Sequence, residues 1–191
     1  MKYARIFLPI ALALVIGACA RPPQADIDAA RKAVADAAKN ADVVAYAPET
    51  LKSAEDKLAQ MEAELTAKHY DKVKGLALDA KTAAGAAAGE AARGREKAKA
   101  DATALIAALK QAVPEAAKKL ATAARARGVK LDFAGLTKQL ADARAAVADA
   151  DKDVTDGNFA AALQKATAVQ SRLSDAERAI TDALQAAGKK K

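Results

Sequence analysis

The chain has 191 residues, a formal net charge of +7 and only 3% aromatic residues, none of which is tryptophan. Alanine is the commonest residue, and because its side chain buries little surface, the composition excludes a thick globular core and favours long, closely packed helices. The basic residues gather in the middle, where residues 67–130 hold fourteen lysines and arginines against six acidic residues.

The first residues have the pattern of a secretory signal. Basic residues at positions 2 and 5 precede an apolar run over residues 6–16, which is too short to cross a bilayer as a helix. Small residues then lead to Cys19, the only cysteine in the sequence, which has no disulfide partner within an exported chain. We therefore predict a signal peptide over residues 1–18.

The residues around Cys19 indicate how the chain is anchored. Residues 16–19, Ile-Gly-Ala-Cys, resemble the lipobox of bacterial lipoproteins. The resemblance implies cleavage before Cys19, a diacylglycerol on its sulfur and a further acyl chain on its new amino group. Several chains anchor stably, whereas one acyl chain binds a membrane only marginally. In enterobacterial lipoproteins an aspartate directly after the cysteine resembles a signal for retention in the inner membrane. This sequence has Ala20 there, which favours the periplasmic face of the outer membrane. A plain signal peptide with an incidental cysteine is the alternative.

Helical spacing begins after a short linker that contains two prolines. Apolar residues three and four positions apart predict a first helix over residues 26–46 and a second over residues 49–67. A third helix is predicted from Tyr70 to about Gln111, because Pro114 lacks the backbone N–H that a continuing helix needs.

The second half of the chain repeats this pattern. A short helical piece is predicted over residues 116–127, and Asp132 is a favourable N-cap for a helix over residues 133–155. The Asp-Gly-Asn sequence at 156–158 is a strong turn signal, and a last helix is predicted over residues 159–187.

These elements predict an all-α fold of elongated, antiparallel helical hairpins that resembles a coiled-coil bundle, with two repeated units. The predicted organisation is a signal peptide (1–18), a lipidated N-terminus and linker (19–25), a first helical hairpin unit (26–112), a connector helix (113–132), a second helical hairpin (133–187) and a basic tail (188–191).

The two hairpins match when the chain is shifted by 89 residues. Each unit contains a helix, a tight turn and an aromatic residue that opens the returning helix, which favours an internal repeat. Because alanine-rich heptads carry little information, chance agreement is the alternative. The matching pairs include Leu51 with Leu140, Ala54 with Ala143, Leu58 with Val147, Leu65 with Val154, Thr66 with Thr155 and Tyr70 with Phe159.

The first unit also resembles a known family. The sequence Tyr-Ala-Pro-Glu at 46–49, followed by His69-Tyr70 and by spaced alanines, resembles an uncharacterised alanine-rich domain of Gram-negative envelope lipoproteins. The resemblance covers roughly residues 20–90 and implies a helical hairpin. In that family the domain sometimes precedes an OmpA-like peptidoglycan-binding domain, which this sequence lacks, so binding to the wall by that route is not implied.

No group of residues predicts catalysis or metal binding. The only histidine, His69, lies in a predicted turn with no neighbour to complete a catalytic or ligand set. Asp149, Asp151, Asp153 and Asp156 suggest calcium at first sight. However, Asp149 and Asp153 share a helix face while Asp151 points elsewhere, which favours a solvated surface. We expect no enzyme activity, no cofactor and no metal.

The basic segment over residues 93–99 has no aromatic residues between its lysines and arginines. Nucleic acid is therefore disfavoured as a partner, and the export signal disfavours it further. A solvated face is the favoured interpretation, and contact with anionic envelope polymers or lipid phosphates is the alternative.

The other end of the sequence suggests a second attachment point. A lysine at position 191 and a predicted lipid at Cys19 together resemble the wall-linked lipoproteins of the Braun type, which implies attachment of Lys191 to peptidoglycan. An even number of long antiparallel segments would instead return the tail towards the membrane. A basic tail that attracts anionic surfaces is the simpler interpretation.

Taken with the predicted anchor, these features favour a structural or scaffolding lipoprotein of the cell envelope. A helical module that recruits a protein partner of an envelope complex is the alternative. A set of lipid-binding helices is disfavoured, because such helices carry large apolar residues on a wide face. The heptad seams predict packing within the chain and leave open a homo-oligomer.

Overall fold

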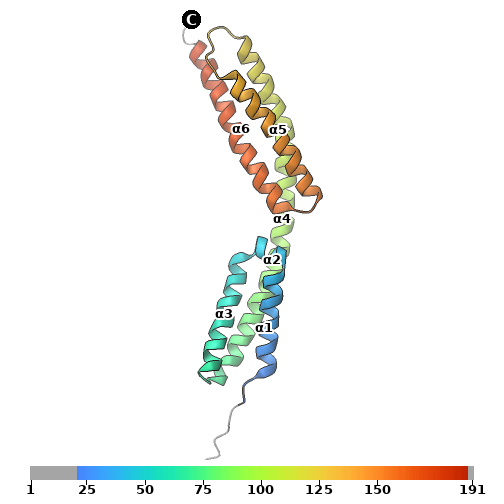
Figure 1. The fold of residues 1–191 in the computed structure, drawn as a ribbon, viewed down its shortest axis with the longest axis vertical. Coiled ribbons are helices and arrows are strands. Elements are labelled where there is room, and N and C mark those ends of the chain that lie inside the picture. Colours follow the sequence, from blue (N-terminus) through green and yellow to red (C-terminus); the bar gives the residue numbers. More distant parts are fainter. Residues whose placement is uncertain (1–20, 189–191) are drawn as a thin grey trace, which may run out of the picture.

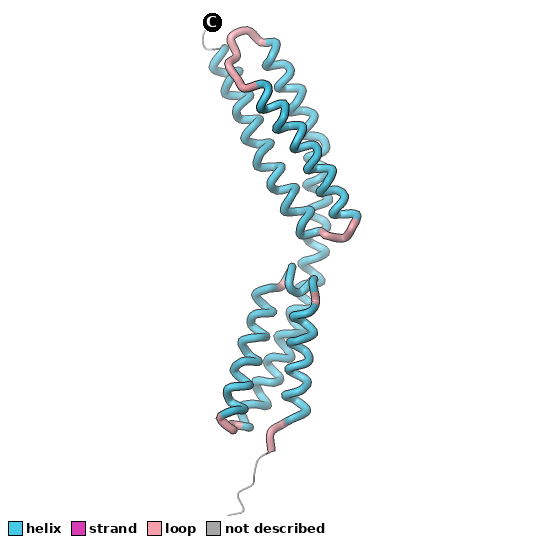
Figure 2. Tube along the Cα trace, in the orientation of Figure 1, coloured by secondary structure: helices cyan, strands magenta, loops and turns pink. Residues whose placement is uncertain are grey.

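The structure is a computed structural model that describes residues 21–188. Within that range it contains six α-helices and no strand, so the predicted all-α fold is confirmed (Figures 1 and 2). The helices are α1 (Gln24–Lys39), α2 (Ala41–Tyr46), α3 (Pro48–Thr66), α4 (Tyr70–Arg125), α5 (Phe133–Thr155) and α6 (Phe159–Gly188).

The helix α4 runs through both halves of the molecule. It has 56 residues, which correspond to a length of about 84 Å at 1.5 Å per residue. Its first half packs against α1, α2 and α3, and its second half packs against α5 and α6, so two helical bundles share one continuous helix (Figure 1). Each bundle has its own hydrophobic core, and the molecule is elongated as the sequence predicts.

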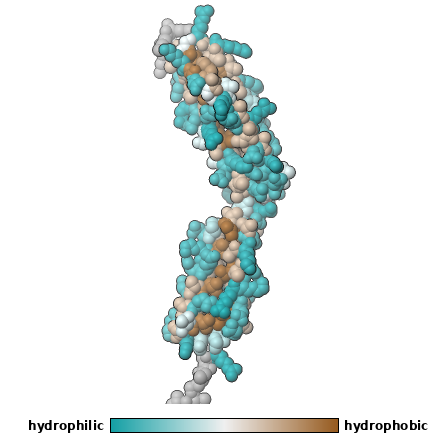
Figure 3. Space-filling model, viewed as in Figure 1, coloured by the Kyte–Doolittle hydropathy of each residue, from teal (hydrophilic) through white to brown (hydrophobic). Residues whose placement is uncertain are grey.

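The cores of the two bundles are narrow. Alanines such as Ala80 and Ala87 are completely buried along α4, where their small side chains let neighbouring helices approach closely. Larger residues such as Ile27, Met61 and Ile106 fill the remaining interior. Figure 3 shows apolar side chains along the middle of the first bundle on the face in view, with hydrophilic residues on either side.

The prediction that Pro114 ends a helix is wrong, because α4 runs through it. Proline removes one backbone hydrogen bond and its ring meets the carbonyl of Lys110, but both neighbouring turns are held by the core. Val113 and Ala116 are buried against the second bundle, so tertiary packing outweighs the local cost. Most of the predicted connector over residues 113–132 is therefore the last part of α4.

The predicted first helix over residues 26–46 is also wrong in one respect, because it is divided at Asn40. The Asn40 side chain accepts hydrogen bonds from the backbone N–H groups of Asp42, at 2.9 Å, and Val43, at 3.4 Å. Asparagine is a strong N-cap, so it starts the short helix α2 instead of continuing α1. By contrast, α5 begins and ends where the sequence predicts, with Asp132 capping it through the N–H of Gly135.

The structure confirms the internal repeat. The turn between α3 and α4 and the turn between α5 and α6 have the same three backbone hydrogen bonds, 89 residues apart. In the first turn the backbone N–H groups of Ala67, Lys68 and His69 donate to the carbonyl oxygens of Ala63, Leu65 and Glu64, respectively. In the second turn those of Asp156, Gly157 and Asn158 donate to the carbonyl oxygens of Lys152, Val154 and Asp153.

The repeat is larger than the predicted hairpin. The helix α1 corresponds to the second half of α4, because the ion pair of Arg31 with Glu62 recurs as that of Lys110 with Asp151, which lies 89 residues after Glu62. The buried residues match in the same register, with Ile27, Ala30, Val34 and Ala37 in the places of Ile106, Leu109, Val113 and Ala116. Each unit is therefore one helix followed by a hairpin. The helix α4 serves as the last helix of the first unit and the first helix of the second.

The two equivalent turns differ at one residue. Both are Schellman motifs, which require a left-handed backbone at one position. That position is Lys68 in the first turn, with φ 61°, and Gly157 in the second, with φ 80°. A side chain makes this conformation less favourable by about 1–2 kcal/mol, so the first turn is the strained one.

We therefore expect Lys68→Gly to raise the free energy of unfolding by about 1 kcal/mol and Gly157→Lys to lower it by a similar amount. Urea unfolding followed by circular dichroism measures both changes. Changes of the same sign in the free energy of unfolding for the two substitutions would contradict this account of the turns.

The start of α1 and the end of α6 lie at opposite ends of the molecule (Figure 1). The expectation that the chain returns to its starting point is therefore wrong for the described residues. The chain does not return because α4 does not fold back at the middle of the molecule. It continues past the first bundle to the far end of the second.

Candidate functional site

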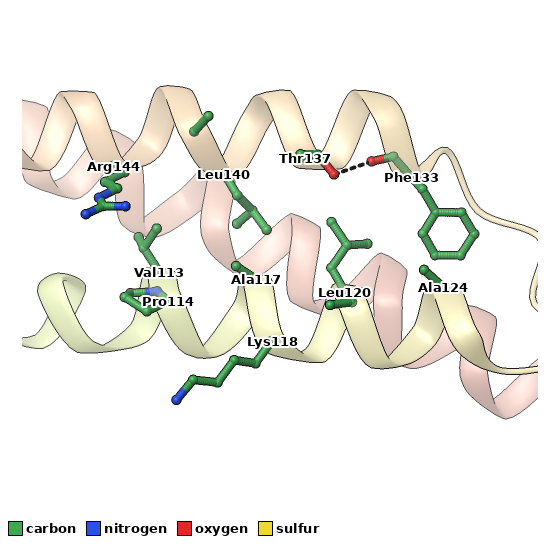
Figure 4. Close-up of a pocket in the computed structure, with 12 residues that line it drawn as sticks. Val113, Pro114, Ala117, Lys118, Leu120, Ala124, Phe133, Thr137, Leu140 and Arg144 are labelled. Carbon is green, nitrogen blue, oxygen red and sulfur yellow. Dashed lines mark hydrogen bonds between the residues drawn. The ribbon is translucent and has the colours of Figure 1, made fainter.

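A groove lies on the second bundle, between α4 and α5 (Figure 4). It has a volume of about 610 Å³ and adjoins a second hollow of about 480 Å³ along the same two helices. The two share Val113, Pro114 and Arg144, so they form one continuous surface, which we call the α4/α5 groove.

The α4/α5 groove is mainly apolar. Buried side chains of Val113, Leu120 and Leu140 lie at its base, and the half-buried ring of Phe133 lies at one end. Its walls are exposed alanines, which leave space because their side chains are short. These alanines are Ala117, Ala121 and Ala124 of α4 and Ala141 of α5.

Positively charged side chains line the walls of the groove. Arg144 on α5 is exposed, and within residues 21–188 no ion pair or hydrogen bond of its side chain is found. Lys118 on α4 has its Nζ 2.7 Å from Glu115, but both side chains are well exposed, so this bond is weak and easily exchanged. At the far end, Lys110 and Asp151 are joined across the two helices at 2.8 Å.

A second arrangement of interest is the joint where the two bundles meet on α4. The hydroxyl oxygen of Tyr46, in α2, accepts a hydrogen bond of 3.1 Å from the backbone N–H of Ala160, in α6. Tyr46 also lies directly against Gly94 of α4, where an added Cβ atom would be only 2.9 Å from the Tyr46 Cβ. A residue of the first bundle thus reaches the second across the surface of α4.

Arg95 completes this joint. Its Nε lies 3.4 Å from Asp42 of α2, and its guanidinium carbon lies 4.9 Å from the centre of the Phe159 ring in α6. Lys99 faces the same ring at 5.8 Å. Cation–π contacts of this kind stabilise modestly at partly exposed sites. Part of the basic segment over residues 93–99 therefore connects the bundles, which the sequence does not reveal because the contacting residues are far apart in the chain.

The Tyr-Ala-Pro sequence of the first unit is thus part of a structural joint, with Pro48 opening α3 directly behind it. Residues 25–105 match a known protein family. It is described as "Domain of unknown function (DUF4398)". The predicted resemblance to an uncharacterised domain is confirmed for this range. The DUF4398 region covers α1, α2, α3 and the part of α4 that carries the joint.

The other comparisons add no relative to the DUF4398 region. No curated protein and no solved structure matches the chain.

His69 lies in the turn before α4, as predicted. Its Nδ1 is 2.5 Å from a carboxylate oxygen of Glu64, and Lys72 lies 3.2 Å from the other oxygen. The hydrogen bond with His69, followed by that from Lys72, lowers the pKa of Glu64 below its ordinary value. The histidine therefore has a partner, Glu64, that holds the turn onto the end of α3.

The aspartates of α5 also have identifiable partners. Asp149 and Asp153 share a face, as predicted, and both contact Lys165 of α6, at 2.5 and 2.7 Å. Asp151 points elsewhere and contacts Lys110. The hydrogen bond from Lys165 lowers the pKa of Asp149. These ion pairs join the helices of the second bundle, and among residues 21–188 no group of three or more potential ligands is placed to hold a metal ion.

Two predicted sites lie outside the described residues. They are Cys19, the predicted lipidation site, and Lys191, the predicted point of attachment to peptidoglycan. Of the helices between them, none has a stretch both long and apolar enough to span a bilayer.

Proposed function

We propose that the protein is an outer-membrane lipoprotein that acts as a rigid spacer in the cell envelope. In this role, acyl chains on Cys19 hold the first bundle at the membrane, and α4 carries the second bundle into the periplasm. The observation that supports it most directly is the continuity of α4, because one unbroken helix joins the two bundles and the start of α1 and the end of α6 lie at opposite ends.

The stiffness that a spacer needs has a physical basis at the joint. A single exposed helix between two bundles would bend easily, but here α2 and α6 are both attached to it. The hydrogen bond from Ala160 to Tyr46 and the contacts of Arg95 with Asp42 and Phe159 connect the bundles beside α4. A lipid anchor fits the same role, since several acyl chains bind a membrane durably without a spanning helix.

The spacer role predicts different heights above the membrane for two labelled positions. Asp71→Cys places a dye at the start of α4, near the start of α1, and Lys130→Cys places one beyond its end. In vesicles that contain the lipidated protein and a lipid-bound acceptor, energy transfer should be strong from position 71 and weak from position 130, because about 84 Å of helix separates them.

A Cys19→Ser variant provides the control for anchoring. It should acquire no label from radioactive palmitate and should not sediment stably with membranes. Similar energy transfer from positions 71 and 130 would show that the rod lies flat and would contradict the spacer role. Full acylation of the Cys19→Ser variant would contradict the anchor.

A further inference from the structure

We propose that the α4/α5 groove is a docking site for one amphipathic helix of another protein, with an apolar face and acidic residues beside it. The proposal goes beyond the spacer role and does not depend on the lipid anchor, so either can fail without the other. It rests on how the two repeated units differ, on the length of the groove and on its charge.

The two units share one contact across these helices and differ at another. Arg31 of α1 corresponds to Lys110 of α4, and Glu62 of α3 corresponds to Asp151 of α5. Arg31 crosses from α1 to α3 and forms two hydrogen bonds with Glu62, at 2.7 and 2.8 Å. Lys110 makes the equivalent contact with Asp151, at 2.8 Å, so this bridge lies at one end of the groove and the rest of the groove stays open.

The α5 wall of the groove differs between the two units. Lys52 of α3 corresponds to Ala141 of α5, one residue after the matched pair Leu51 and Leu140. The second unit thus has a short apolar side chain on its α5 wall where the first has a long charged one. Such a surface admits the close approach of another helix, which gains most from small residues on both sides of the contact.

The dimensions of the groove suit a helix of about four turns. Along α4 it extends from Leu109 to Ala124, which is about 22 Å at 1.5 Å per residue. Its apolar base, formed by Val113, Leu120 and Leu140, matches a partner with apolar residues at positions i, i+3, i+4 and i+7. A helix in this place would turn the three-helix arrangement of the second bundle into a four-helix bundle.

The charge of the groove selects an acidic partner. Arg144 lies beside the apolar base with no ion pair within the described residues, and the bond of Lys118 to Glu115 is exposed. Charge of this kind contributes mainly to specificity and to the rate of association. A second copy of the chain bound groove to groove is disfavoured, because it would bring Arg144 and Lys118 of both copies together.

Two synthetic helical peptides of about 16 residues test the proposal, since this length matches the groove. Both have leucine and alanine on one face, and they differ only in carrying glutamates or lysines beside it. Binding to the full-length chain in phosphatidylcholine vesicles is measured by fluorescence anisotropy. The acidic peptide should bind saturably with micromolar affinity, and the basic peptide at least about tenfold more weakly.

Variants of the chain locate the site. Arg144→Glu should weaken the acidic peptide about tenfold and strengthen the basic one, because the charge is reversed. Ala121→Glu, on the groove wall, should also weaken the acidic peptide, whereas Ala104→Glu should not. Ala104 is likewise an exposed alanine of α4 but does not line the groove, so it controls for net charge and helix stability.

Three outcomes would overturn the proposal. They are equal binding of the two peptides, unchanged binding by the Arg144→Glu variant, and equal losses from Ala121→Glu and Ala104→Glu. A different result would assign the groove to an acyl chain instead: a fluorescent palmitate binds saturably, its binding is lost in the Arg144→Glu variant, and the acidic peptide does not bind. Circular dichroism of each variant should show unchanged helix content, because all the substituted residues are exposed.

Discussion

Alanine at position 94 is expected to destabilise the protein, although alanine normally stabilises a helix relative to glycine. The Cβ atom of Gly94→Ala would lie 2.9 Å from the Cβ of Tyr46, which is closer than packed atoms allow, and 3.3 Å from its carbonyl oxygen, which is a tight contact. The backbone of α2 cannot move without disturbing the Tyr46 hydrogen bond to Ala160. Overpacking of this kind typically costs about 1–3 kcal/mol, which outweighs the helical gain of about 1 kcal/mol.

Gly85→Ala is the matched control for this prediction. Gly85 lies in the same helix, and an added Cβ would meet no atom within 4 Å, so only the helical preference acts. We expect this variant to be more stable than the parent by about 1 kcal/mol. Thermal and urea unfolding followed by circular dichroism measure both variants. Stabilisation by Gly94→Ala as large as that by Gly85→Ala would show that the joint is loose.

Local turn and cap signals in the sequence were sufficient to predict the hairpins. Asp132 supplies the cap of α5, and the Asp-Gly-Asn sequence at 156–158 supplies a turn with the required left-handed glycine. These interactions involve residues within a few positions of one another, so their outcome depends little on the rest of the fold. The start and end of α5 follow directly from them.

The features that the sequence did not predict depend on distant contacts. The continuity of α4 through Pro114 requires the packing of Val113 and Ala116 on the second bundle, which no local rule contains. The joint brings together Tyr46, Gly94 and Ala160, which are separated by many residues. In each case the deciding energy comes from tertiary contacts, whereas sequence patterns report mainly local preference.

The α4/α5 groove was missed for a related reason. Ala117, Ala121 and Ala124 recur at helical spacing and could equally belong to a buried seam, as many other alanines of this chain do. Only the position of α5 and α6 around α4 shows that this stripe stays exposed. A sequence signal does exist in the comparison of the two hairpins, where Ala141 stands in place of Lys52, but a single exposed alanine does not by itself predict a groove.

Pro114→Ala is expected to stabilise the second bundle by about 1–3 kcal/mol. Proline within a helix costs about 3 kcal/mol relative to alanine, since it removes a hydrogen bond to the carbonyl of Lys110 and its ring presses on that carbonyl. Part of the gain is lost because the unfolded chain becomes more flexible, by about 0.4–1 kcal/mol. Pro114 is exposed, so the substitution opens no cavity in the core.

Ala104→Pro is the reciprocal variant, because it places a proline at an exposed alanine in the same helix and should destabilise by about 3 kcal/mol. Hydrogen exchange followed by mass spectrometry separates the two bundles, since it reports local stability along the chain. After Pro114→Ala, protection should rise in α5 and α6 and stay unchanged in α1 and α3, whose core is separate. A loss of protection in α5 would show instead that the proline sets a bend in α4 on which the second core depends.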